Sequence, residues 1–229
     1  MIKKENRRHA TRIITIILAF TMTFTLLAGC GAAHTDKSDG GAPSNSTSLP
    51  PVNQDGFIVI TMPITLLGGN PAAELQKQHE AKIASMSEEE IERLAWTKLV
   101  AHEDGNLDYY FTPEQFERTK AAAYMAGQLI DSATNAYPAE YIKDTEYTDI
   151  DENGVPWELT VWVDGKEYTS FELVNSYYVT LSPAVYLGMF QILSGVSGDE
   201  WAVHVTVKDA ESDEVISETD FPTRTGAEE

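Results

Sequence analysis

Cysteine is almost missing from this 229-residue chain, since Cys30 is the only one. No disulfide can form within the chain, so a folded domain must be stabilised by its apolar core. A zinc site built on several thiolates is excluded as well, and the five histidines show no zinc-ligand spacing. We therefore expect neither a disulfide framework nor a zinc-dependent fold.

Positive charge is scarce too: 16 Lys and Arg residues face 36 Asp and Glu residues, a formal net charge of −20. A chain this acidic has no basic patch for phosphates, which excludes nucleic-acid binding. The acidity favours a highly soluble surface, and recognition of a cationic partner is the alternative.

Catalytic motifs are the third absence. The chain has no Gly-x-Ser-x-Gly nucleophile motif and no glycine-rich phosphate loop. Carboxylates are so numerous that no pair stands out for acid-base hydrolysis. The sequence predicts a protein that is not an enzyme and uses no cofactor.

The lone cysteine lies in an informative context. A basic segment, 1–12, precedes an apolar run, 13–27, and Ala28, Gly29 and Cys30 follow directly. This order resembles a bacterial lipoprotein signal. The apolar run is shorter than the ~20 residues that span a bilayer, so an uncleaved membrane helix is the less favoured alternative. The resemblance implies cleavage between Gly29 and Cys30 and a lipid on Cys30, which would anchor the protein at the outer face of the cell membrane.

The chain then divides into three parts. Residues 1–29 form the expected signal peptide, and 30–54 form a tether rich in Gly, Ala, Ser, Thr, Asn and Pro. Residues 55–229 are long enough for a single domain with its own core. Without residues 1–29 the chain keeps 11 basic and 35 acidic residues, a net charge of −24.

Caps, turns and periodicity predict the elements of that domain. The uniformly apolar run 57–62 predicts a buried strand, and Ser87 with Glu90 forms a capping box. Strands are expected at 57–62, 97–102, 107–111, 141–150, 157–163, 201–208 and 214–221. Helices are expected at 72–84, 88–96, 112–135, 169–178 and 184–193. We predict an α+β fold, an antiparallel sheet with hairpins and two or three helices packed mainly on one face.

Four segments carry a resemblance to known proteins: Ile60-Thr61-Met62-Pro63, Glu103-Asp104-Gly105 with Tyr109-Tyr110-Phe111-Thr112, Gly188-Met189-Phe190-Gln191, and Glu214-Val215-Ile216-Ser217. They resemble a group of uncharacterised small lipoproteins of Gram-positive, clostridia-like bacteria. The similarity spans residues 55–221 and is interrupted at 76–90. It implies the same element order and a lipoprotein, and it implies no catalytic or binding residue.

Asp149, Asp151 and Asn153, followed by Gly154, match the first half of a calcium-binding loop. Thr160 stands where such a loop needs a bidentate glutamate, and Pro156 begins the next strand. The pattern favours a polar turn, with calcium as the alternative; we expect no metal site.

Two aromatic residues are candidates for an interaction surface. In an extended strand Trp162 lies on the face opposite Leu159, Val161 and Val163. Tyr110 likewise lies on the face opposite Leu107, Tyr109 and Phe111. Exposed Trp and Tyr can stack on sugars or anchor a protein partner, unless helices cover both faces of the sheet. We therefore expect a non-catalytic, membrane-anchored module that contacts a protein or the cell envelope. A receptor for a small ligand or cation is the alternative.

Overall fold

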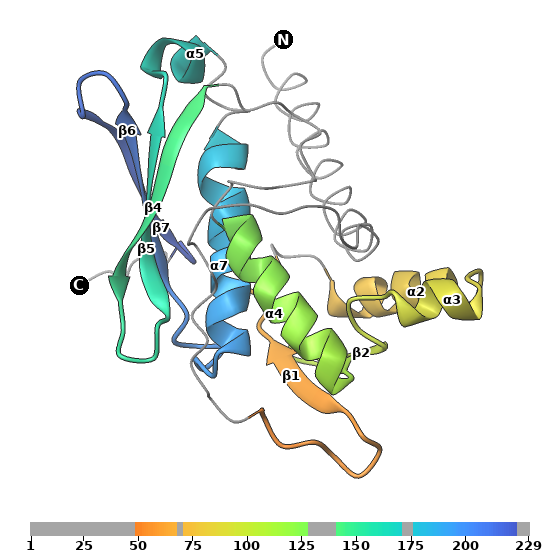
Figure 1. The fold of residues 1–229 in the computed structure, drawn as a ribbon. Coiled ribbons are helices and arrows are strands. Elements are labelled where there is room, and N and C mark those ends of the chain that lie inside the picture. Colours follow the sequence, from red (N-terminus) through yellow and green to blue (C-terminus); the bar gives the residue numbers. More distant parts are fainter. Residues whose placement is uncertain (1–48, 68–70, 128–140, 171–175, 224–229) are drawn as a thin grey trace.

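The computed structural model describes residues 49–67, 71–127, 141–170 and 176–223. The expected signal peptide, the cleavage site Gly29–Cys30 and most of the tether lie outside these residues. The described chain forms two β-sheets with helices between and beside them (Figure 1).

The smaller sheet, sheet A, has three antiparallel strands in the order β1-β3-β2. The predicted hairpin is confirmed as β2 (Lys98–Ala101) and β3 (Leu107–Phe111). Its turn contains Gly105 at φ 88°, the left-handed conformation that glycine adopts most easily. The first strand, β1 (Ile58–Met62), adds to the far side of β3.

The larger sheet, sheet B, has four strands in the order β4-β5-β6-β7. These are β4 (Ile142–Ile150), β5 (Pro156–Val163), β6 (Val203–Asp209) and β7 (Val215–Phe221). The β4–β5 and β6–β7 pairs are antiparallel hairpins, whereas β5 and β6 run parallel. Parallel neighbours need a long crossover, and the chain between β5 and β6 provides it with helices α5 (Gly165–Ser170) and α7 (Ser182–Leu193).

Helix α7 is the centre of the molecule. It follows a π-helical turn, η2 (Tyr177–Leu181), and nearly all its side chains are buried, as the apolar sequence predicted. It contacts β5 and β6 of sheet B and β1 of sheet A, so both sheets share one core (Figure 1). Helix α4 (Pro113–Gly127) packs along it.

Two further helices, α2 (Ala72–Ile83) and α3 (Glu88–Glu92), lie beside sheet A, where α2 packs on β2. The Ser87–Glu90 capping box is confirmed at the start of α3. The buried histidine of α2, His79, approaches the carbonyl of Thr97 with its Nε2 at 3.3 Å and lies beside the Trp96 ring.

The α+β class is confirmed, and the finer description is wrong in two respects. The strands form two sheets, and sheet B is mixed instead of antiparallel. Pairing of β5 with β6 joins segments about forty residues apart along the chain, and local patterns do not report such pairing.

One burial pattern and two element boundaries also differ from expectation. The apolar run 57–62 forms an edge strand with only Ile58 and Met62 buried. The helix expected at 88–96 ends at Glu92. The segment that follows is hydrogen-bonded to α4, because Gln115 and Arg118 donate to the Leu94 carbonyl.

The second boundary is the start of α5. The sequence predicts a helix at 169–178. Instead, Asp164 caps α5, because its Oδ1 accepts from the backbone N–H groups of Lys166 and Glu167. Residues 171–175, and the predicted end of the long helix at 128–135, lie outside the described residues.

Candidate functional site

Sheet B has one packed face and one open face. Leu159, Val161 and Val163 of β5 point into the core, and Val203, Val205 and Val207 of β6 do the same. The helices α4 and α7 lie on that side of the sheet (Figure 1), and no helix of the described residues covers the other side. Because strand side chains alternate, the remaining positions form an outer face.

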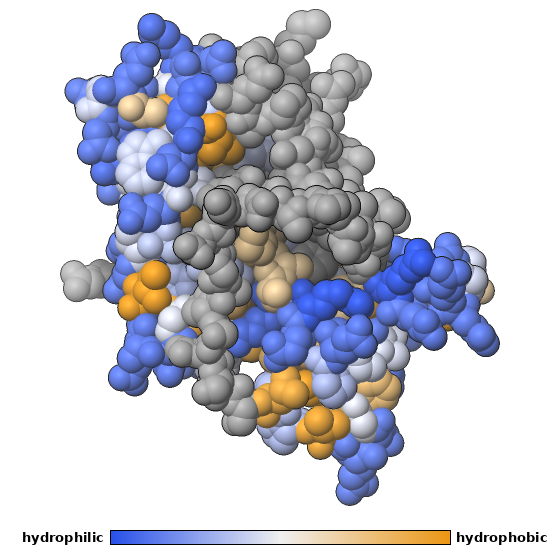
Figure 2. All heavy atoms as spheres, in the orientation of Figure 1, coloured by the Kyte–Doolittle hydropathy of each residue, from blue (hydrophilic) through white to orange (hydrophobic). Residues whose placement is uncertain are grey.

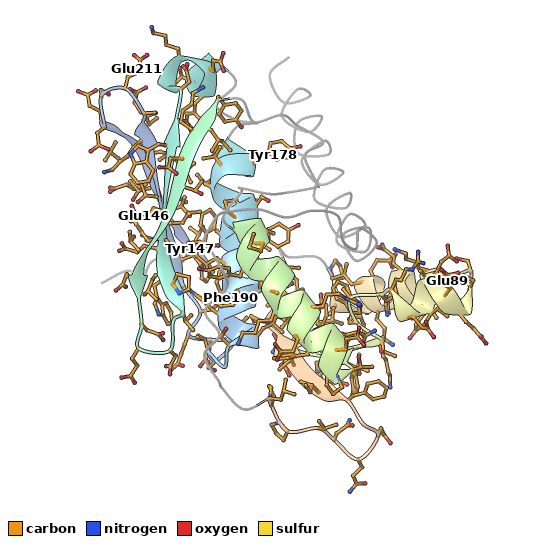
Figure 3. All side chains as sticks on the ribbon, in the orientation of Figure 1. Glu89, Glu146, Tyr147, Tyr178, Phe190 and Glu211 are labelled. Carbon is orange, nitrogen blue, oxygen red and sulfur yellow. The ribbon has the colours of Figure 1, made fainter. Side chains whose placement is uncertain are left out.

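The outer face is built from three pairs of neighbours across the parallel β5–β6 ladder. The register pairs Glu158 with His204, Thr160 with Thr206, and Trp162 with Lys208. Hydroxyl, carboxylate and aromatic groups are thus mixed on one face of the sheet. Figure 3 shows the same alternation in β4, where Glu146 and Tyr147 lie on opposite sides of the sheet.

Trp162 is held in place by its neighbours. Its indole Nε1–H donates to Asp213 Oδ1 at 2.9 Å, and Lys208 Nζ lies 5.7 Å from the ring centroid. Lys208 Nζ is also 3.5 Å from Asp213 Oδ1. The hydrogen bond from Trp162, helped by the charge of Lys208, lowers the pKa of Asp213, so this carboxylate stays ionised. Trp162 lies on the face opposite Leu159, as its phase predicted, and is half-buried.

A second polar row, which the sequence did not predict, crosses the same face. His204 Nδ1 lies 2.7 Å from Asp220 Oδ1, and its Nε2 is 4.0 Å from Glu218 Oε1. On the opposite edge, Thr148 Oγ1 donates to Glu158 Oε2 at 3.1 Å. Acidic groups of β5 and β7 therefore flank one imidazole on β6. Only the strand register brings them together, so alternation alone could place His204 outward but could not name its partners.

Tyr110 belongs to a different surface. It lies on the outer face of sheet A, between Val59 of β1 and Lys98 of β2. Lys98 Nζ is 5.0 Å from its ring centroid, and the Phe57 ring packs edge-on at 6.1 Å. The two candidate aromatics therefore do not form one patch.

An Asp–His pair accompanies Tyr110 on sheet A. Asp108 accepts from Thr61 Oγ1 at 2.7 Å and lies 2.9 Å from His102 Nε2. The hydrogen bond to Asp108 and its charge raise the pKa of His102. This is not the geometry of a catalytic triad, because the hydroxyl bonds to the carboxylate and not to the imidazole.

The calcium candidate forms an ordinary turn between β4 and β5. Asp151 Oδ1 accepts from the backbone N–H groups of Asn153 and Val155, both at 2.8 Å. Asp149 stands at the end of β4 with φ 49°. Among the described residues, no group of three or more His, Cys, Asp or Glu side chains is placed to hold a metal ion.

The surface in Figure 2 is mainly hydrophilic over sheet B, whereas apolar residues gather near β1. Within the described ranges, no helix has both the length and the apolar character needed to cross a bilayer. No family model matches this chain, and neither a curated protein nor a solved structure matches it.

Proposed function

We propose that this protein is a lipid-anchored, extracytoplasmic binding module that contacts the cell envelope through the outer face of sheet B. The observation that carries the proposal is an open four-stranded face with an ordered tryptophan on one of its two central strands. Trp162 is oriented by Asp213 and Lys208 before any partner arrives, so little side-chain entropy is lost on binding.

The chemistry of this face favours an envelope polymer as the partner. Indole rings stack on sugar rings, and hydroxyl and carboxylate groups hydrogen-bond to sugar hydroxyls and to amines. Thr160 and Thr206 lie side by side at the centre of the sheet, with Glu158 on one side and Trp162 on the other. An open sheet face suits an extended polymer better than a small molecule, which needs a concave site.

The anchor supports the same function. A lipid on Cys30 would place the domain outside the cell membrane, and the tether up to residue 54 would let it reach the overlying envelope. No catalytic step is part of the proposal, since this face needs only to bind.

The receptor hypothesis has weaker support. A cation receptor needs convergent oxygen ligands, and the Asp151 carboxylate is already occupied by two backbone N–H groups of its own turn.

Co-sedimentation of the purified protein with purified Gram-positive cell-wall sacculi tests the proposal. Trp162→Ala should weaken binding by about fivefold or more, the usual effect of losing an aromatic anchor. Tyr110→Ala is the matched control, because it removes a half-buried aromatic from the outer face of the other sheet. Circular dichroism verifies that both variants are folded.

Three results would overturn the proposal: wild-type protein that does not sediment with sacculi, unchanged binding by Trp162→Ala, or an equal loss in Tyr110→Ala. The last result would move the contact to sheet A.

A further inference from the structure

The edge strand β1 differs from the other sheet edges of the described chain. Its five residues, Ile58–Met62, carry no charge, and in the described residues they pair with β3 alone. An unpaired strand edge presents a row of backbone N–H and C=O groups, to which another chain can add. Proteins usually block such edges with charged residues, proline, bulges or a covering segment.

The other three edges are blocked in these ways. On the far side of sheet A, β2 has only four residues and is covered by α2, whose Gln76 Oε1 accepts from the Ala101 N–H at 2.8 Å. In sheet B, the edge strand β4 carries Lys143, Asp144 and Glu146, and β7 carries Glu218 and Asp220. Of the four sheet edges in the described residues, β1 is therefore the one with neither a charged residue nor a covering helix.

Strand β1 is also firmly held, as a docking edge must be. Ile58 and Met62 are fully buried in the shared core. On the outer face, Thr61 donates to Asp108 of β3 at 2.7 Å. A rigid, preformed edge binds an incoming strand with a smaller ordering cost than a mobile one.

Charge at the two ends of β1 indicates the kind of partner. Asp55 lies in the turn that leads into the strand. At the other end, Ile64 N–H donates to Asn106 Oδ1 at 3.1 Å, and Asn106 in turn donates to both carboxylate oxygens of Asp104. An uncharged strand is thus flanked by carboxylates at both ends.

A second copy of this chain fits the edge poorly. Pairing β1 with β1 would bring together two molecules of net charge −20, with acidic turns at both ends of the paired strands. Val52 and Ile64, which precede and follow the strand in the sequence, are exposed apolar residues and favour a partner that also carries apolar side chains.

We infer that the free edge of β1 binds an extended peptide with an uncharged, β-forming middle and basic ends, which it adds as a fourth strand of sheet A. Backbone hydrogen bonds would supply most of the affinity, and the acidic turns would select the basic ends. This surface belongs to the other sheet and does not depend on the function proposed for sheet B.

The test uses a synthetic peptide of alternating valine and threonine with lysines at both ends, titrated into the full chain. Hydrogen exchange should show slower exchange of backbone amides in Ile58–Met62 when the peptide is bound. Thr61→Lys should weaken binding by about tenfold, because a lysine on an open edge blocks strand addition and repels the peptide ends.

Val215→Lys is the matched control, since it adds the same charge to an exposed position on the edge strand of sheet B; its affinity should equal that of the wild type. A peptide with glutamates in place of the lysines should bind less tightly.

Four results would overturn the inference: no binding, binding without protection of β1, equal affinity for Thr61→Lys, or equal affinity for the glutamate peptide. Protection of β1 that rises with protein concentration alone would overturn it as well, in favour of pairing between copies.

Discussion

Gln191 offers the sharpest test of how helix α7 is joined to strands β5 and β6 of sheet B. This side chain is fully buried on the otherwise apolar helix α7. Its Nε2 donates to the carbonyls of Pro156 and Ala202, both at 2.8 Å, and its Oε1 accepts from the Ala202 N–H at 3.1 Å. One amide therefore ties the start of β5 and the approach to β6 to the central helix.

Gln191→Leu keeps the size of the side chain and removes all three hydrogen bonds. Each buried backbone group left without a partner costs about 1–3 kcal/mol. At ~2 kcal/mol for each of the three groups the loss is ~6 kcal/mol, and better burial of leucine offsets ~2 kcal/mol. The free energy of unfolding should therefore fall by about 4 kcal/mol, a large share of the 5–15 kcal/mol typical of domains.

Urea unfolding of the purified protein measures this change. The urea midpoint should fall, while the slope of the unfolding free energy against urea concentration stays constant. The melting temperature should drop by roughly 8–16 °C. Gln78→Leu is the control. Among the described residues the Gln78 amide donates to Glu74 of its own helix, so the change in stability should stay within about 0.5 kcal/mol. A loss below about 1 kcal/mol for Gln191→Leu would refute the argument, since it would mean that these backbone groups find other partners.

Three further outcomes are expected. Burial lowers the pKa of His79, so the unfolded chain binds a proton at this histidine more readily than the folded chain does. The free energy of unfolding should therefore fall as the pH drops below about 6.5. Urea unfolding should show a smaller fall for His79→Gln than for the wild type, and equal falls would contradict this. Cys30→Ser should abolish incorporation of labelled fatty acid, whereas wild-type protein with an unmodified Cys30 in its membrane fraction would rule out the anchor. Millimolar calcium should leave the melting temperature unchanged, because Asp151 already accepts two backbone N–H groups; a rise that disappears in Asp151→Ala would establish a calcium site.

The sequence alone predicted those elements whose causes are local. The Ser87–Glu90 capping box and the alternation in 157–163 each act within a few residues, and the structure confirms both. For the same reason the phase of Trp162 was readable from its neighbours in β5.

Local signals failed where two of them competed. Both Asp164 and Thr169 have side chains suited to capping a helix, and the structure uses Asp164. A tertiary contact accompanies that choice, because Gly165 N–H donates to Asp209 Oδ2 at 2.9 Å and an added Cβ at Gly165 would collide with the same carboxylate. Asp209 is more than forty residues away along the chain, so no local pattern could include it.

The sequence by itself therefore determined the type and approximate limits of most elements, through caps, turns and periodicity. Only the tertiary structure decided that the strands form two sheets, that β5 pairs in parallel with β6, and that the apolar run before Pro63 lies at an edge. The candidate face follows the same division: alternation placed Trp162 outward, while the pairing of distant strands placed Lys208 and Asp213 beside it. Pairing depends on backbone hydrogen bonds and on burial in a shared core, which are properties of the whole chain and not of any one segment.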